Sequence, residues 1–186
     1  MKKVFLIHGF EGTPNGGWRP YLMRELEKRD IYACALPMQD PEHPVLSEWL
    51  GEIERVLANN PHDEIYLLAH SLGGSTLLRL LETTTATNIK GCVFASTPSA
   101  KRTEGNVYVQ GFLKTDPDWQ TIKTKAQKFA VIHGDNDPLV PLSEGQAIAD
   151  NLGCEIVVIP NGKHLNGSAG FTELPQALEL VLKILD

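Results

Sequence analysis

The sequence predicts an α/β fold, a three-layer α/β/α sandwich with a mostly or wholly parallel sheet of about six strands. Short apolar stretches of strand length alternate along the whole chain with longer stretches of helical periodicity. This alternation is typical of parallel strands joined by crossover helices. Several strand candidates are nearly continuous apolar runs, as expected when helices cover both faces of the sheet.

The expected elements follow one another in a regular order. The strands are expected at Val4–His8, Ile31–Leu36, Ile65–Ala69, Ile89–Ala95, Phe129–His133 and Glu155–Ile159. The helices are expected at about Trp18–Arg29, Ser47–Ala58, Leu72–Thr83, Leu142–Asn151 and Thr172–Leu185. Ser47 and Ser143 have side chains typical of N-caps, and Gly153 follows a helix end. The least regular stretch, Thr97–Gln127, is expected to form a loop with a short helix above the sheet edge.

Length and composition are those of a globular protein. The 186 residues fit one domain with a single core, and no repeat or linker divides residues 1–186. Apolar residues make up 42% of the chain and charged residues 22%, both ordinary values. The net charge of −6 argues against a nucleic-acid binder, which needs a basic patch.

The sequence also constrains the cellular setting. No apolar run approaches the roughly 20 residues that span a bilayer, so no membrane span is expected. The start of the chain has too short an apolar core for a signal peptide, and a first core strand is expected there. The three cysteines, Cys34, Cys92 and Cys154, lie in or beside strand-like runs. Free, buried thiols in a reducing compartment, and hence a cytoplasmic location, are expected.

Ser71 carries the strongest signal for chemistry. It lies between the apolar run Ile65–Leu68, typical of a buried strand, and the run Leu77–Leu81, typical of a helix. A serine on a tight strand-to-helix turn has its hydroxyl held above the sheet in strained backbone geometry. Such a turn needs small residues two positions before and after the serine, and Ala69 and Gly73 occupy these positions. The pattern therefore predicts a nucleophilic serine.

A nucleophilic serine needs a base, usually a histidine that a carboxylate orients. Asp137 follows the fifth expected strand and His164 follows the sixth, so both leave the sheet at the edge where Ser71 lies. The order serine, acid, histidine is that of hydrolases with a nucleophile elbow. Asp135 competes for the acid role, and spacing does not exclude it. Asp137 is favoured because Pro138 fixes its loop, and Asp135 is then expected to bond its own backbone in a turn.

The negative oxygen of a tetrahedral intermediate needs two backbone donors. The residue after the nucleophile, Leu72, is expected to supply one N–H at the start of its helix, where the dipole favours negative charge. The second N–H is expected from the loop after the first strand, and Phe10 is the preferred candidate.

The remaining histidines have structural interpretations. His8 and His133 end strands and are expected to make structural hydrogen bonds, while His70 is expected to point away from Ser71. A metal site of His8, His133, Asp135 and His164 can be imagined, but no short ligand spacing supports it, and no metal is expected. Four apolar side chains are candidates for an acyl pocket or for ordinary packing: Trp18, Met38, Phe112 and Leu139.

With these residues placed, the chain resembles the α/β-hydrolases, and specifically the small YdeN-like serine hydrolases related to retinoblastoma-binding protein 9. The matching segments are Ile7–Gly9, Trp18, Leu36–Met38, Trp49–Leu50, Leu68–Gly73, Asp137–Pro141, His164 and Gly170–Pro175. The resemblance implies a compact core without a large cap domain, and a triad of Ser71, Asp137 and His164. Gly17, Lys163 and Leu165 depart from the residues that relatives often have there, namely histidine, glycine and phenylalanine, so a substrate preference is not transferred.

The leading functional hypothesis is a serine hydrolase that cleaves a carboxylic ester, or a thioester, of a small or flexible acyl substrate. Its expected partner is the small-molecule ester, with no cofactor and no nucleic acid. The same triad serves peptidases and amidases, which remain subordinate options. The alternative from a different class is a non-enzymatic protein-binding module on a hydrolase scaffold, since a fold does not fix a function. The sequence itself does not indicate a protein partner.

Overall fold

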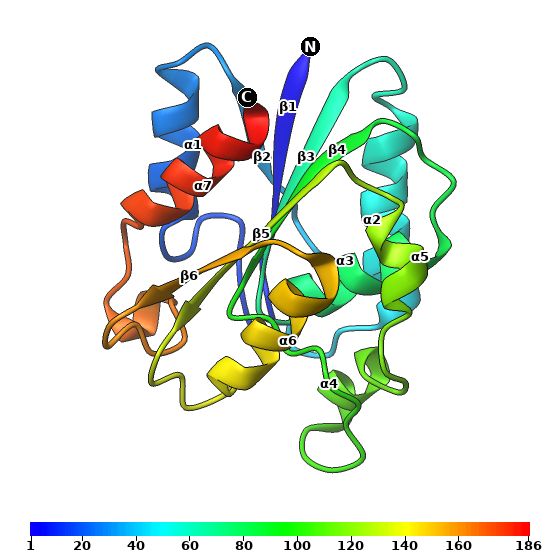
Figure 1. Cartoon of the computed structure of the whole chain (residues 1–186), viewed down its shortest axis with the longest axis vertical. Coiled ribbons are helices and arrows are strands. Elements are labelled where there is room, and N and C mark those ends of the chain that lie inside the picture. The colour runs from blue at the N-terminus through cyan, green and yellow to red at the C-terminus, as the bar shows by residue number, and fades with distance from the viewer.

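The computed structural model describes all 186 residues and is built around a six-stranded parallel sheet (Figure 1). The strands are β1 (Lys2–Ile7), β2 (Tyr32–Ala35), β3 (Glu64–His70), β4 (Ile89–Ala95), β5 (Lys128–Gly134) and β6 (Glu155–Ile159). Their order across the sheet is β2-β1-β3-β4-β5-β6, and every neighbouring pair is parallel. The predicted parallel sheet is therefore confirmed.

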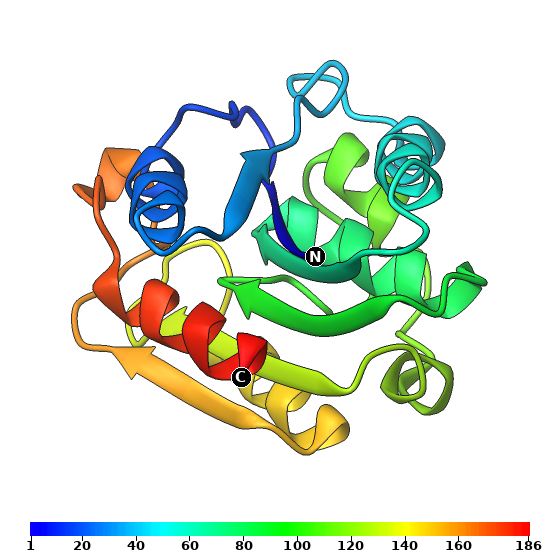
Figure 2. The same ribbon diagram turned by 90° about the horizontal axis from the view of Figure 1, so that it is seen from above.

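Helices cover both faces of this sheet (Figures 1 and 2). One face carries α1 (Arg19–Glu27) and α7 (Pro175–Leu185). The other carries α2 (Leu46–Ala58), α3 (Leu72–Thr83), α4 (Val107–Phe112), α5 (Trp119–Lys123) and α6 (Leu142–Leu152). The three-layer arrangement agrees with the prediction, and no large cap domain stands over the sheet.

The central strands show why this sequence forms a sheet buried on both sides. In β3, Ile65, Leu67 and Ala69 belong to the hydrophobic cluster under α2 and α3, whereas Tyr66 and Leu68 belong to the cluster under α1 and α7. Successive side chains of a strand point to opposite faces, so a continuous apolar run feeds both clusters.

The topology places a candidate functional site at the carboxyl ends of the strands. From β1 the chain passes to α1 on one face, and from the neighbouring β3 it passes to α3 on the other face. Loops that leave adjacent strands in opposite directions open a crevice between them, and ligands bind in such crevices at the carboxyl ends of parallel strands. The loop after β1 begins at His8, and Ser71 follows β3.

Several local expectations need correction. Ser47 and Ser143 do not cap helices: α2 and α6 begin one residue before them, and neither helix has a side-chain cap. α7 begins at Pro175 rather than Thr172, because a proline fits the first turn, where its missing N–H is not needed. The stretch 97–127 contains two short helices, α4 and α5, capped by the side chains of Asn106 and Asp118.

Two further observations bear on the expected setting. No helix combines the length and the apolar character needed to cross a bilayer. Cys34, Cys92 and Cys154 are all free thiols, and burial raises the pKa of the fully buried Cys92 thiol. Cys34 and Cys154 are only partly buried, which corrects the expectation of three buried thiols.

Candidate active site

Ser71 lies on the turn between β3 and α3 in a strained backbone conformation. Its φ of 55° and ψ of −125° fall in a region that residues with a side chain rarely adopt. The turn is tight because β1 passes directly behind it. A Cβ atom on Gly73 would collide with the carbonyl oxygens of Ile7 and His8, so only glycine fits there. Close packing against β1 thus requires the small residue that the sequence has two positions after the serine.

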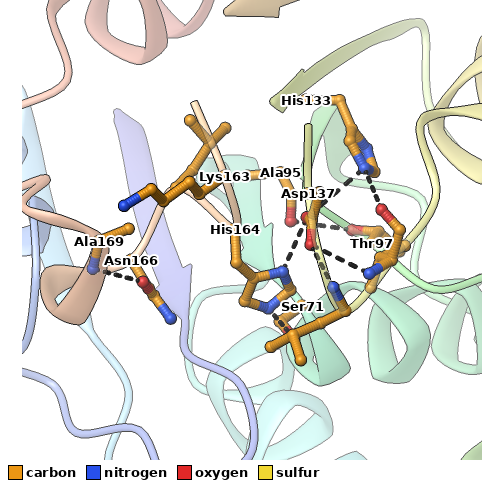
Figure 3. Close-up of polar contacts among 12 residues, drawn as sticks. Ser71, Ala95, Thr97, His133, Asp137, Lys163, His164, Asn166 and Ala169 are labelled. Atoms are coloured by element: carbon orange, nitrogen blue, oxygen red, sulfur yellow. Dashed lines mark hydrogen bonds and ion pairs between the residues drawn. The ribbon is translucent and has the colours of Figure 1, made fainter. Parts of the chain in front are cut away.

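A chain of two hydrogen bonds joins Ser71, His164 and Asp137 (Figure 3). The Ser71 Oγ lies 2.8 Å from His164 Nε2, and His164 Nδ1 lies 2.8 Å from Asp137 Oδ2. With the carboxylate ionised, Nδ1–H donates to it, and the Nε2 lone pair accepts from the serine hydroxyl. The three residues come from the loops after β3, β5 and β6, as the sequence predicts.

The carboxylate of Asp137 is held in place from both sides. Its Oδ1 accepts hydrogen bonds from the N–H groups of Leu139 and Val140, at 2.8 and 3.0 Å. Burial raises the pKa of Asp137, but the hydrogen bonds from His164, Val140 and Leu139 outweigh it and lower the pKa below its usual value. The group therefore stays ionised at neutral pH and fixes the tautomer of His164.

The loops that carry the acid and the histidine are tied together by consecutive side chains. Asp135 accepts a hydrogen bond from the N–H of Asn161, and Asn136 accepts one from the N–H of Lys163, each at 2.8 Å. Asp135 therefore neither contacts His164 nor bonds its own turn, which corrects the expected turn role. The sequence offers one signal for this arrangement: residues 135–137 are three consecutive short acceptors after a strand.

His70 contributes to the site in a way that the sequence does not reveal. Its ring makes no hydrogen bond to Ser71 and lies 5.0 Å from the ring of His164, centroid to centroid. Its Nε2–H donates to the backbone oxygen of His164 at 2.8 Å. Burial, together with the nearby His164, lowers the pKa of His70 to about 3, so the ring is neutral. His70 thus holds the backbone of His164 without competing for its proton.

Two N–H groups are candidates for stabilising a negative oxygen beside Ser71. The N–H of Phe10 makes no hydrogen bond within the protein. The N–H of Leu72 occupies the first position of α3, where no intrahelical acceptor exists. The expected pair, Phe10 and Leu72, is therefore free to donate, and its role stays a prediction.

A cleft of about 520 Å³ opens beside Ser71. Its lining is mostly backbone and polar: Gly9, Phe10, Glu11, Gly12, Thr13, Gly16, Gly17, Trp18, Arg19, His70, Ser71, Leu139, His164, Asn166, Gly167 and Ser168. Of the four expected pocket residues, Trp18 and Leu139 line it. Met38 and Phe112 do not, because both are buried in the hydrophobic cluster under α2 and α3. Their burial places them in the core, and the sequence alone does not distinguish an apolar core residue from an apolar pocket residue.

The other histidines near the site make structural contacts. His133 Nε2–H donates to the backbone oxygen of Val140 at 2.9 Å, which supports the loop after Asp137. His8 packs edge-on against Trp49 with ring centroids 5.7 Å apart, and burial lowers its pKa. No group of three or more histidine, cysteine or acidic side chains is close enough to hold a metal ion.

Comparison with known proteins gives consistent matches along the whole chain. Residues 4–183 match the family described as serine hydrolase. YdeN of Bacillus subtilis, a hydrolase by name, is 30% identical over 174 residues, which cover 94% of this chain and 91% of that protein. Serine hydrolase RBBP9 of Rattus norvegicus is 23% identical over 186 residues, with 98% and 95% of the two chains covered.

The structural comparison agrees with the sequence comparison. The crystal structure of the ydeN gene product of B. subtilis superposes with a TM-score of 0.92 at 27% identity, with 100% of this chain and 99% of that chain covered. Est1E of Butyrivibrio proteoclasticus superposes with a TM-score of 0.76 at 18% identity, covering 99% and 88% of the two chains. At 18% identity, the similarity to Est1E shows only a shared fold.

Proposed function

The chain belongs to the serine hydrolase family, and we propose that it cleaves carboxylic esters or thioesters through an acyl-enzyme on Ser71. The observation that carries this proposal is the pair of 2.8 Å hydrogen bonds that connect Ser71 Oγ to His164 and His164 to Asp137. A serine hydroxyl with a neutral imidazole base, itself oriented by a buried carboxylate, is the arrangement that acyl transfer requires.

Acylation begins when the Ser71 oxygen attacks the carbonyl carbon of the ester while His164 Nε2 takes the hydroxyl proton. The carbonyl oxygen becomes negative, and the N–H groups of Phe10 and Leu72 stabilise it. When the intermediate collapses, the bond to the alcohol or thiol breaks, and the protonated His164 gives its proton to that leaving group. The acyl group is then bound to Ser71 as an ester.

Deacylation repeats these steps with water as the nucleophile. His164 removes a proton from the water, whose oxygen attacks the acyl carbon and forms a second tetrahedral intermediate. Collapse of this intermediate breaks the bond to Ser71 and releases the carboxylic acid, and His164 returns the proton to the serine oxygen. Asp137 stabilises the positive imidazole in both halves of the cycle without taking its proton.

Steady-state hydrolysis of short 4-nitrophenyl esters by the wild type and by Ser71→Ala tests the proposal. We expect the variant to lose at least about 1,000-fold in kcat, since the residual rate comes from the oxyanion donors and binding alone. Ser75→Ala is the matched control, because this neighbouring buried hydroxyl bonds only the backbone oxygen of Pro98. Turnover of esters by folded Ser71→Ala at the wild-type rate would contradict the proposal.

We further propose a cytoplasmic location for this activity. Its support is the state of the three cysteines, which are free thiols and suit a reducing compartment.

A further inference from the structure

One wall of the cleft carries a cation without an acidic partner. Arg19 is the first residue of α1 and lines the same cleft as Ser71, and only 6% of its surface is exposed to solvent. No carboxylate lies within 4 Å of its guanidinium, since the ion pairs of the protein all involve other groups. A charge that is largely buried and unpaired is costly, and a ligand that supplies a counter-ion lowers that cost.

Backbone contacts fix the position of this guanidinium. Its Nε–H and one Nη2–H donate to the backbone oxygen of Thr13, at 3.0 and 2.8 Å. The loop packs closely around it, because a Cβ atom on Gly16 would lie 2.8 Å from Nη2. An arginine has five N–H donors, so three remain without a protein acceptor. Nη1, which has no hydrogen-bond partner in the protein, is not sealed from solvent, and the side chain lines the cleft where a ligand can reach it.

The charge of Arg19 acts on the residues around Ser71. Burial lowers the pKa of Arg19 to about 10, which leaves the side chain cationic at neutral pH. Burial lowers the pKa values of His8 and His70, and repulsion from the positive charge of Arg19 lowers them further. The other charged residue of the lining, Glu11, is exposed and forms no ion pair.

The rest of the lining does not favour a long apolar acyl chain. Only Phe10, Trp18 and Leu139 are hydrophobic among the 16 lining residues, and much of the wall is glycine backbone. An arginine held by its Nε edge presents its remaining N–H groups as a fork, a geometry that matches a carboxylate.

We propose that Arg19 is a specificity-determining residue that binds a carboxylate carried by the substrate, so that the preferred substrates are short anionic esters such as hemiesters of dicarboxylic acids. This inference rests on the proposed ester hydrolysis at Ser71. The substrate carboxylate supplies the counter-ion that the protein lacks, while the ester carbonyl lies at Ser71 in the same cleft.

A matched pair of esters tests the inference. Mono-4-nitrophenyl adipate carries a carboxylate, and 4-nitrophenyl 6-methylheptanoate carries an uncharged isopropyl group at the same position. We expect the wild type to prefer the anionic ester by kcat/KM. In Arg19→Gln the ratio of the two kcat/KM values is expected to fall about 10- to 100-fold, the effect of losing a charged hydrogen-bond partner.

Two further variants separate recognition from loop structure. Arg19→Lys keeps the charge without the fork, so an intermediate ratio is expected. Glu11→Gln removes the negative charge of the same cleft and is expected to raise kcat/KM for the anionic ester alone. Equal losses on both esters in Arg19→Gln, or no wild-type preference for the anionic ester, would overturn the inference while leaving ester hydrolysis at Ser71 intact.

If neither ester is hydrolysed, the result counts against the proposed function. The carboxylate site is then tested separately by measuring the binding of free adipate. Calorimetric titration of adipate into the wild type and Arg19→Gln is expected to show binding that weakens at least about tenfold in the variant. Equal affinity for the two proteins, or no binding to either, would reject the carboxylate site.

Discussion

The two sides of Ser71 are built in opposite ways. On the acid–base side, the loops of residues 134–140 and 160–165 are joined by side-chain acceptors at three consecutive positions, 135, 136 and 137. On the cleft side, the loop of residues 9–17 contains four glycines and receives one fixed cation, Arg19.

This difference separates two tasks. General-base catalysis depends on geometry within fractions of an ångström, and hydrogen bonds from several directions hold His164 in that geometry. Substrate selection needs space and a small number of directional groups, which the glycine-lined cleft and Arg19 supply. Variants on the acid–base side should therefore affect all substrates equally, whereas variants on the cleft side should change the order of preference.

The largest effect is expected from Asp137→Asn. The amide cannot hold His164 in the tautomer that leaves Nε2 free to accept the serine proton, so kcat should fall by about 10,000-fold on every ester. Asp135→Asn is the matched control: it makes the same chemical change two residues away and keeps an oxygen acceptor for the N–H of Asn161. Its kcat should fall by less than about tenfold.

Steady-state kinetics on one neutral ester measures both variants. If Asp135→Asn lost as much activity as Asp137→Asn, the assignment of the acid role to Asp137 would be wrong.

A smaller but still large effect is expected from Gly134→Ala. The new Cβ atom would collide with the backbone of Gly162 and Lys163 and push the two loops apart. We expect about 1–3 kcal/mol of lost stability and a kcat about 100-fold lower, because His164 moves away from Ser71. Thermal unfolding and kinetics measure the two effects.

Gly16→Ala provides the comparison on the cleft side. Its Cβ atom would meet a side chain, at Nη2 of Arg19, rather than backbone, so the guanidinium has to leave its hydrogen bonds to Thr13 while the backbone keeps its path. We expect near-normal stability and an altered preference between anionic and neutral esters. If Gly16→Ala and Gly134→Ala lowered the stability equally, the proposed difference between the cleft side and the acid–base side would be wrong.

The effect that is smallest near neutral pH is the coupling of stability to pH through His70. Its pKa is about 3 in the folded protein, well below the usual value near 6.5 of the unfolded chain. Between pH 6.5 and pH 3, His70 is therefore protonated in the unfolded chain but not in the folded protein. The free energy of unfolding is highest above pH 6.5 and decreases as the pH falls toward 3. One such proton contributes a slope of up to about 1.4 kcal/mol per pH unit.

His70→Gln removes this titration and keeps an N–H donor for the backbone of His164. Denaturant unfolding between pH 4 and pH 7 should show a shallower loss of stability in the variant than in the wild type. Parallel curves for the two proteins would show that His70 does not titrate as its burial requires.

The sequence predicts most of the fold because strand and helix patterns are strong local signals. The parallel sheet, its covered faces and the family resemblance are confirmed by the structure and the comparisons. Residues 71, 137 and 164 could be placed near one another because topology brings the carboxyl ends of parallel strands to one edge. The structure places them in hydrogen-bond contact, and their catalytic roles stay predictions.

What the sequence could not supply depends on contacts between distant loops. Asp135 bonds Asn161 across 26 positions, and His70 bonds the backbone of His164 across 94 positions. Neither contact leaves a local pattern. Met38 and Phe112 fail as pocket residues for a related reason: an apolar side chain looks the same in a sequence whether it faces the core or a cleft.

The most direct test of the central claim is covalent labelling of Ser71 by a fluorophosphonate, read by mass spectrometry. The reagent should add one phosphonyl group per chain, on the peptide that contains Ser71, and labelling should be strongly slowed in His164→Ala and absent in Ser71→Ala. A folded wild-type protein that remains unlabelled, or that is labelled at a different serine, would contradict the assignment of Ser71 as the nucleophile.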